Sequence, residues 1–126
     1  MVTCDNKKER YRVVVSNGRD EIASDTTDDK GGGGSAMRPH EFLEAALAAC
    51  LNMTIRMHAD REGIPLTKIT TQVSADRSRP GHTIFRYSFD LEGALTNEQR
   101  EGLQRVAEAC PVRKTLSNAI SFVGSV

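Results

Sequence analysis

The chain has 126 residues, a length suited to a single domain, residues 1–126, with a core of its own. Seventeen basic and 17 acidic side chains cancel and no long run of one sign occurs, so neither nucleic acid nor an anionic membrane is expected as a partner. The longest apolar stretch is far below the roughly 18 residues of a membrane span, and the N-terminus lacks the layout of a signal peptide. We therefore expect a cytoplasmic protein.

The chain has three cysteines, Cys4, Cys50 and Cys110, which are too few for a disulfide scaffold and include no closely spaced pair for a metal. The three histidines form no helical i,i+4 pair, so we expect neither a metal nor another cofactor. In a reducing compartment such cysteines belong to the core or carry chemistry. Cys4 lies in a polar segment, residues 1–9, that we expect to be disordered or extended, and we interpret it as an incidental exposed thiol.

The first predicted element is a β-hairpin. Residues 11–16 contain three consecutive β-branched valines, and residues 19–24 can return as the second strand. Asn17-Gly18 between them is the strongest two-residue hairpin signal. A Gly-rich loop over residues 25–38 follows, acidic at first and then carrying four consecutive glycines. We interpret it as a connector rather than a phosphate cradle, because no Gly-Lys-Ser/Thr follows and its aspartates would repel phosphate.

A long helix is predicted from Pro39 to Glu62, roughly 36 Å at 1.5 Å per residue. Pro39 suits a first helical turn, Glu41 places negative charge near the positive helix end, and Gly63 provides the stop. The alanines of its first half leave room for another helix to approach near Cys50, so we expect a central, enclosed helix. Its predicted buried stripe consists of Leu43, Leu47, Cys50, Thr54 and Met57.

A second hairpin and another helix follow in the predicted order. Residues 67–75 and 83–91 alternate apolar and polar side chains on either side of an Arg-Pro-Gly turn, which indicates paired, half-buried strands. Thr96 and Gln99 form a capping box at the start of an amphipathic helix that ends at Cys110.

The last predicted elements are a short helix and a strand. Pro111 suits a first helical turn, so residues 112–118 are expected to form the short helix with Cys110 at its N-cap. Residues 119–126 are expected to form the strand that closes the chain.

Position in the chain alone ranks the two thiols by how readily each forms a thiolate. Cys110 at a helix N-terminus meets unpaired backbone N–H groups and the positive dipole end, with Arg113 and Lys114 a turn away, and all of these favour thiolate. Cys50 lies in mid-helix, where activation depends on side chains brought in by the fold. Each cysteine can also be read as a small buried hydrophobe.

Two motifs sixty residues apart resemble the OsmC/Ohr family. The stretch 39–54 carries a proline, a glutamate and an alanine-rich helix leading to Cys50, and the stretch 110–116 matches the second cysteine motif. The Gly-rich loop, the order of hairpins and the capped helix also fit, so the resemblance covers about residues 10–126. It implies an α+β fold, with antiparallel sheets packed around a long central helix, in an intertwined homodimer whose two sites lie near the subunit interface.

The resemblance also implies a chemistry. It implies a thiol-dependent peroxidase that reduces organic hydroperoxides or hydrogen peroxide, in which Cys50 attacks the peroxide, Cys110 resolves it to a disulfide, and a dithiol reductant restores both thiols. This assignment reverses the ranking obtained from position. The family activates its first cysteine with an arginine and a glutamate, and Glu41 is the candidate for the glutamate.

The sequence departs from the family pattern at both activating positions. Residues 25–36 hold no arginine, which leaves Lys30, Arg38 or Arg19 as substitutes, and His40 stands where the peroxidase glutamate commonly stands. A proline followed two residues later by the acidic Glu41 resembles the broader OsmC-like branch.

Three further residues are weak candidates for the site. His40 and His58 can contact the thiols if their helix face allows it, although isolated helical histidines are more often structural or solvent-facing. Arg113 can steady a thiolate, or it can be a solvated surface charge.

Two other functions fit the same residues. One is a non-catalytic dimer whose interface cavity binds a small hydrophobic ligand, with both cysteines inert. The other is a thiol redox sensor that forms the disulfide but turns over poorly. An active pair requires an accessible Cys50 of low pKa and Cys110 within disulfide reach.

Overall fold

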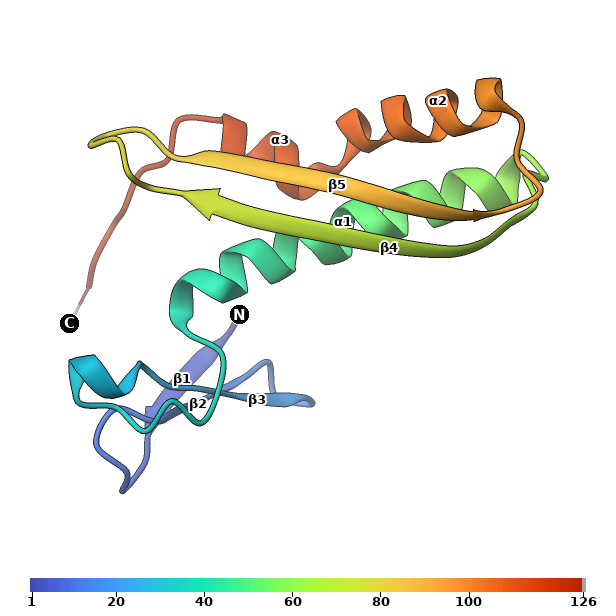
Figure 1. The fold of residues 1–126 in the computed structure, drawn as a ribbon. Helices are drawn as coiled ribbons and strands as arrows, with labels where there is room; N and C mark the ends of the chain where they lie inside the picture. Colours follow the sequence, from blue (N-terminus) through green and yellow to red (C-terminus); the bar gives the residue numbers. More distant parts are fainter. Residues whose placement is uncertain (126) are drawn as a thin grey trace. The chain divides into compact units, whose positions relative to one another are not determined.

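The computed structural model describes residues 1–125 (Figure 1), and the chain divides into two compact units, Met1–Leu43 and a second that begins at Glu44. The first unit contains an antiparallel sheet in the order β1-β2-β3, formed by β1 (Thr3–Asn6), β2 (Val13–Ser16) and β3 (Glu21–Ser24). The predicted hairpin is confirmed: the Asn17 side chain accepts hydrogen bonds from the N–H groups of Arg19 and Asp20, and Gly18 takes the positive φ of 93° that its turn requires.

The Gly-rich loop has more order than its composition predicts. It contains a 3-10 turn, η1 (Asp28–Lys30), and it closes around Asp25, whose residue is only 4 % exposed. The Asp25 carboxylate accepts hydrogen bonds from Thr26 N (2.8 Å) and from both Ser35 N (3.2 Å) and Ser35 Oγ (2.8 Å). These bonds, with that from the Ser35 hydroxyl the strongest, hold the pKa of Asp25 below its ordinary value. A buried, ionised carboxylate thus fixes a loop that contains four consecutive glycines.

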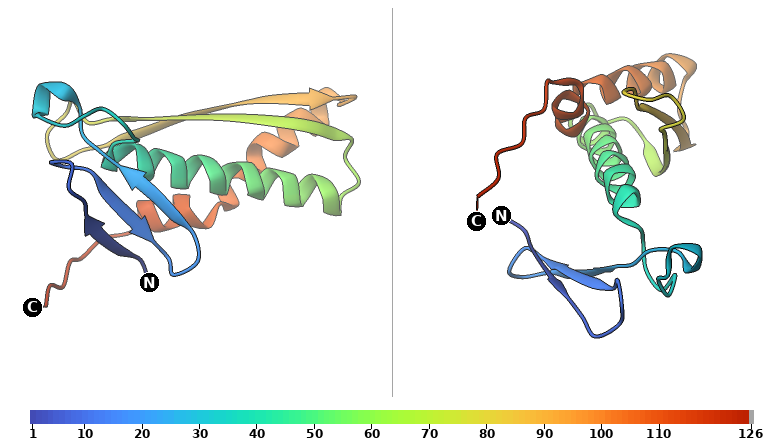
Figure 2. Two further views of the ribbon diagram at one scale, coloured as in Figure 1. Left: turned by 90° about the horizontal axis from the view of Figure 1, so that it is seen from below. Right: turned by 90° about the vertical axis from the view of Figure 1, so that its left-hand side faces the viewer.

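Three helices and one long hairpin build the second unit. Its elements are α1 (Pro39–Arg61), which begins in the first unit, β4 (Leu66–Asp76), β5 (Ile84–Gly93), α2 (Asn97–Val106), η2 (Ala107–Ala109) and α3 (Pro111–Ser117). Strands β4 and β5 pair antiparallel, and the helices lie on one face of this hairpin (Figure 2). The predicted α+β class with antiparallel sheets is confirmed.

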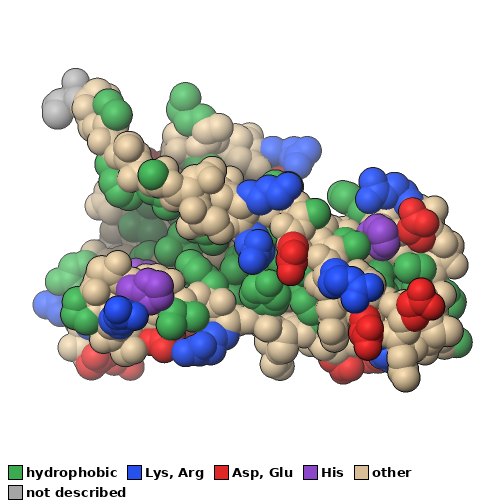
Figure 3. Space-filling view, turned by 90° about the horizontal axis from the view of Figure 1, so that it is seen from above, with side chains coloured by type: hydrophobic (Ala, Val, Ile, Leu, Met, Phe, Trp, Pro, Cys, Tyr) green, Lys and Arg blue, Asp and Glu red, His purple; other side chains and the backbone are tan. Residues whose placement is uncertain are grey.

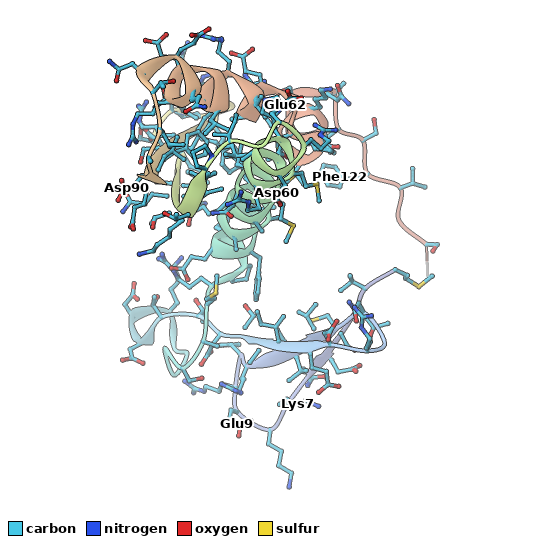
Figure 4. All side chains as sticks on the ribbon, turned by 90° about the vertical axis from the view of Figure 1, so that its right-hand side faces the viewer. Lys7, Glu9, Asp60, Glu62, Asp90 and Phe122 are labelled. Atoms are coloured by element: carbon cyan, nitrogen blue, oxygen red, sulfur yellow. The ribbon has the colours of Figure 1, made fainter. Side chains whose placement is uncertain are left out.

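The predicted strand at residues 119–126 is wrong for residues 119–125, and Val126 lies outside the described residues. The segment leaves α3 as an extended tail, on which Phe122 is marked in Figure 4. Ile120, Phe122 and Val123 remain 56 %, 93 % and 97 % exposed. A strand requires a neighbour that satisfies its N–H and C=O groups, and no strand among residues 1–125 pairs with this tail.

The core of the second unit lies between α1, the hairpin and α2. Its buried residues are Leu47, Leu51, Ile55, Ala59, Leu66, Leu91, Leu103, Ala107 and Cys110. The predicted buried stripe of α1 is therefore wrong in part: Leu47 is buried, but Leu43 and Met57 are 46 % and 61 % exposed. Helix α1 carries apolar side chains on two faces, so periodicity alone could not select the buried one.

Two polar side chains tie α1 to β4. The Glu44 carboxylate accepts a hydrogen bond from Ala75 N at 2.7 Å. The Asn52 amide donates to Ile69 O and to Thr71 Oγ1, both at 3.1 Å. These bonds fix the rotation and height of the helix against the strand, and with them the position of every residue on its other face.

Charge and hydropathy in the structure agree with the sequence. Positive and negative side chains are interspersed on the face drawn in Figure 3, where no patch of a single sign stands out. None of the helices within residues 1–125 has both the length and the apolar composition needed to cross a bilayer.

Gly93 and Gly102 provide a matched test of this packing. Gly93 has φ 142°, and an added Cβ would lie 2.2 Å from Pro65 O, so we expect Gly93→Ala to lower the free energy of unfolding by about 2–4 kcal/mol. Gly102 lies inside α2, where a Cβ meets nothing closer than 4.0 Å. Gly102→Ala should therefore raise stability by about 0.5–1 kcal/mol. Urea unfolding at one protein concentration measures both changes, and equal effects of the two would contradict the packing at Pro65.

Candidate thiol site

The fold brings Cys50 and Cys110 together from opposite halves of the second unit. Cys50 lies in the middle of α1, Cys110 lies between η2 and α3, and their side chains are hydrogen-bonded to each other. Cys110 is completely buried, whereas Cys50 is partly accessible. Cys4 lies on β1 in the first unit and is exposed, as expected.

Helix capping places Cys110. The predicted capping box is confirmed, because the Thr96 hydroxyl accepts from Gln99 N (3.1 Å) and the Gln99 side chain accepts from Thr96 N (2.9 Å). Helix α2 then leads through η2 to Pro111, the first residue of α3. Cys110 is the N-cap of α3, as predicted, and its Sγ accepts a hydrogen bond from Arg113 N at 3.4 Å.

The surroundings of the two thiols shift their pKa values in the order opposite to the one predicted from position: the pKa of Cys50 is lowered and that of Cys110 is raised. Burial raises the pKa of Cys50, but hydrogen bonds from the Cys110 thiol, the Val112 N–H and the Thr54 hydroxyl outweigh burial and leave the pKa below its ordinary value. Burial and the hydrogen bond with Cys50 both raise the pKa of Cys110, and the Arg113 N–H offsets only part of this. The ranking by position is therefore wrong: a helix N-terminus does not compensate for complete burial of Cys110.

The two sulfur atoms titrate as one system. Because the pKa of Cys50 is lowered and that of Cys110 is raised, the first proton leaves Cys50, and the Cys110 thiol then donates its hydrogen to the thiolate. A thiolate beside a protonated thiol is the arrangement that a nucleophile and its disulfide partner require.

Thr54 and Val112 are site residues that the sequence analysis did not identify. The Thr54 hydroxyl donates to Cys50 O at 2.7 Å and also reaches the Cys50 sulfur. It has one hydrogen, so it serves one acceptor at a time, and ionisation of Cys50 favours the sulfur. The position of Thr54, four residues after Cys50 on one helix, was the available signal. Val112 acts through its backbone, which no side-chain pattern reveals.

The predicted activating groups of the first unit have partners within that unit. Arg19 pairs with Asp20 at 3.2 Å. Arg38 donates to Glu41 from its backbone N (2.7 Å) and its side chain (3.2 Å), and the side-chain bond is the main reason that the pKa of Glu41 is lowered. Glu41 therefore caps the first turn of α1, and a role of Glu41 at the thiols stays a prediction.

Of the remaining candidates, Lys30 and His40 belong to the first unit, and His58 and Arg113 belong to the second. Lys30 ends η1 in the first unit, and His40 is exposed. His58 is half-buried near the end of α1. The side chain of Arg113 lines a separate cavity of 370 Å³ together with Leu47. No cation within residues 44–125 is among the groups that lower the pKa of Cys50.

A cavity of 530 Å³ opens beside Cys50. Most of its lining comes from successive turns of α1, and η2 and Pro111 supply the rest. The lining residues are Ala46, Ala49, Cys50, Met53, Thr54, Met57, Arg61, Ala109 and Pro111. The surface is apolar, apart from the thiol, one hydroxyl and one guanidinium, so it suits an organic molecule better than an ion. Within residues 1–125 no three His, Cys, Asp or Glu side chains gather as a metal site would require.

An α+β fold with a cysteine on a long central helix and a second cysteine at a helix N-cap defines a recognisable class. Residues 32–123 match the family described as OsmC-like protein, and the chain therefore belongs to that family. A comparison with curated proteins gives no match.

Solved structures share the fold at low sequence identity. A structure described as a putative osmotic stress induced and detoxification response protein, from Psychrobacter arcticus, has a TM-score of 0.76 at 21 % identity, over 90 % of this chain and 85 % of that one. An OsmC-like protein from Mycoplasma pneumoniae has a TM-score of 0.75 at 20 % identity (92 % and 85 %). The organic hydroperoxide resistance protein OhrB of Bacillus subtilis has a TM-score of 0.61 at 22 % identity (94 % and 90 %).

The Thr54 hydroxyl should control the reactivity of Cys50. Thr54→Val removes the donor at nearly constant volume, so we expect Cys50 to react with iodoacetamide roughly two- to tenfold more slowly at pH 7. The lowered pKa of Cys50 keeps thiolate present at lower pH than for an ordinary thiol, and the pH profile of alkylation should move upward in the variant. Thr54→Ser keeps the hydroxyl and should behave like wild type. Peptide mass spectrometry that finds identical Cys50 profiles in all three proteins would contradict this role.

Proposed function

We propose that the protein is a thiol-dependent peroxidase that reduces organic hydroperoxides or hydrogen peroxide through Cys50 and Cys110. The observation that carries the proposal is the contact between a partly accessible Cys50 of lowered pKa and a buried, protonated Cys110. Family membership supports the same class, since relatives of this fold are described as organic hydroperoxide resistance proteins. The expected compartment is the cytoplasm, where dithiol reductants are available.

The proposed reaction has three steps. The Cys50 thiolate attacks the distal oxygen of ROOH, the O–O bond breaks, and the products are a Cys50 sulfenic acid and, after protonation, the alcohol ROH. Cys110 attacks the sulfenic sulfur, hydroxide leaves as water, and a Cys50–Cys110 disulfide forms. A dithiol then reduces the disulfide by two successive thiol exchanges. In the reduced protein, the hydrogen bond between the sulfurs places the resolving thiol beside Cys50 before the peroxide reacts.

The cavity supports an organic substrate. Hydrogen peroxide gains nothing from apolar walls, whereas an alkyl or aryl hydroperoxide buries its apolar part against Met53, Met57 and the alanines of α1. We therefore expect organic hydroperoxides to react faster than hydrogen peroxide.

The same cavity favours a second candidate, a non-catalytic protein that binds a small hydrophobic ligand. The mostly apolar lining fits this candidate, because it can bury a hydrophobic molecule whether or not the thiols react. A redox sensor is the intermediate case, in which the disulfide forms but is reduced slowly. The peroxidase, the ligand-binding protein and the redox sensor differ in whether peroxide oxidises the thiols and whether a dithiol then restores them.

Stopped-flow titration of the reduced protein with cumene hydroperoxide and hydrogen peroxide tests the reaction. We expect rapid loss of two thiols per chain in wild type, none of it in Cys50→Ser, and a sulfenic acid that persists in Cys110→Ser. Cys4→Ser serves as the control and should retain wild-type rates. Thiols that survive excess peroxide would exclude both the peroxidase and the sensor, whereas disulfide formation without turnover by added dithiol would identify the sensor.

A homodimer remains part of the proposal. The exposed face of α1 carries Met53 and Met57, at 58 % and 61 % exposed, and the apolar tail after α3 has no partner strand among residues 1–125. Both features are typical of surfaces that a second subunit covers. A second copy on this face would also close the open side of the cavity.

Light scattering tests the dimer. Wild type should have twice the mass of the single chain, and Met53→Glu should shift the protein toward monomer because it places a charge in an apolar contact. Met53→Leu keeps the apolar surface and should remain dimeric. A monomeric wild type at micromolar concentration would overturn the dimer without affecting the thiol chemistry.

A further inference from the structure

We infer that the cavity between the β4–β5 turn and α3 is a second ligand site, which binds a small aromatic carboxylic acid through Arg113. The cavity has a volume of 370 Å³, within the range of sites that hold small molecules. It lies at the end of the second unit where the hairpin turn and α3 come together (Figure 1). Binding there does not depend on the proposed peroxidase function, since neither Cys50 nor Cys110 is among the lining residues.

Burial divides the cavity lining into a floor, walls and a mouth. Leu47 is only 2 % exposed and forms the floor. Phe85 of β5 and Leu116 of α3 are half-buried and provide apolar walls, whereas His82 and Tyr87 are exposed at the mouth. Aromatic rings pack well against a flat ring in offset or edge-to-face contacts. The cavity therefore suits a ligand with an aromatic body and a polar group nearer the solvent.

Arg113 supplies the charge that selects a carboxylate. Its backbone is used by the fold, because its N–H donates to Cys110 Sγ (3.4 Å) and its C=O accepts from the Ser117 hydroxyl (2.8 Å). Its half-buried guanidinium has no hydrogen bond or ion pair within residues 1–125, whereas those of Arg56 and Arg100 each donate to a strand carbonyl at 2.6 Å. A guanidinium beside an apolar wall is well suited to hold a carboxylate through two parallel hydrogen bonds.

The chain around the cavity carries positive charge. The two segments that provide most of the lining lie within residues 77–89 and 109–125, which contain four arginines, one lysine and one histidine but no aspartate or glutamate. On α1, Glu44 precedes Leu47 by three residues, but its carboxylate already accepts a hydrogen bond from Ala75 N at 2.7 Å. In a chain whose charges otherwise cancel, this local excess favours an anion over a cation.

The site does not use the face of α1 that the proposed homodimer covers. Met53 and Met57 line the cavity beside Cys50, and no residue lines both cavities. Leu47 belongs instead to the buried core between α1, the hairpin and α2. One chain therefore supplies the floor, the walls and the guanidinium of the second site.

Calorimetry with naphthoate and its neutral amide, naphthamide, tests the role of Arg113 in the full-length reduced protein. We expect wild type to bind naphthoate roughly tenfold more tightly than naphthamide, because the amide keeps the rings but loses the ionic contact. Arg113→Gln should abolish this preference and leave naphthamide binding unchanged. Its backbone N–H to Cys110 is retained, and matching circular dichroism and thermal unfolding verify that the variant is folded.

Arg61→Gln is the matched control, because it removes the same charge from the cavity beside Cys50. It should bind naphthoate as wild type does. Equal binding of acid and amide by wild type, or a preference that is lost in Arg61→Gln and kept in Arg113→Gln, would overturn the site. Cys50→Ser should also bind naphthoate normally, so a protein that fails to reduce peroxides leaves this inference standing.

Amide NMR spectra of isotope-labelled protein locate the probe. Naphthoate should shift the signals of residues 82–87 and 113–117 more than those of residues 53–57, in wild type and equally in Met53→Glu, the variant designed to weaken the dimer. Shifts concentrated at residues 53–57 would place the probe beside Cys50 instead. Binding that appears only in Met53→Glu would mean that a second copy fills the cavity, and either result would overturn the second site.

Discussion

The burial of one ridge of α1 is the constraint on which the second unit depends. Leu47, Leu51 and Ile55 pack against the hairpin and α2, and they fix which way every other residue of the helix points. Cys50 immediately precedes Leu51, at the edge of this ridge, so it is neither sealed in the core nor free on the surface. Partial burial of this kind lets a thiol contact internal donors while a substrate can still reach it.

The reactivity of the pair follows from the balance between burial and hydrogen bonding. Burial and hydrogen bonding act on both thiols, but they shift the two pKa values in opposite directions. Cys50 accepts hydrogen bonds from three donors, whereas the Cys110 thiol donates its hydrogen to Cys50. Hydrogen bonds to an ionised group are stronger than those between neutral groups, which explains how they outweigh the desolvation of Cys50. The Thr54 hydroxyl and the Val112 N–H thus lower the pKa of Cys50, an effect that the family pattern assigns to an arginine.

The sequence predicted those features that local chemistry determines. The Asn17-Gly18 turn, the capping box at Thr96 and the N-cap at Cys110 each depend on a few neighbouring residues, and each was predicted correctly. Features that depend on residues distant in the sequence were not predicted correctly. The buried face of α1 is decided by the hairpin and α2, residues 119–125 have no strand to pair with inside residues 1–125, and the pKa order of the thiols depends on how deeply the fold buries Cys110.

One face of α1 serves every function considered for this protein. Met53 and Met57 belong both to the cavity lining and to the exposed apolar surface that a second copy would cover. A substitution on this face therefore changes ligand binding and association together, and activity alone cannot separate them. Thr54 is the informative exception, since it acts on Cys50 through one hydrogen bond and does not supply a large apolar side chain on which association depends.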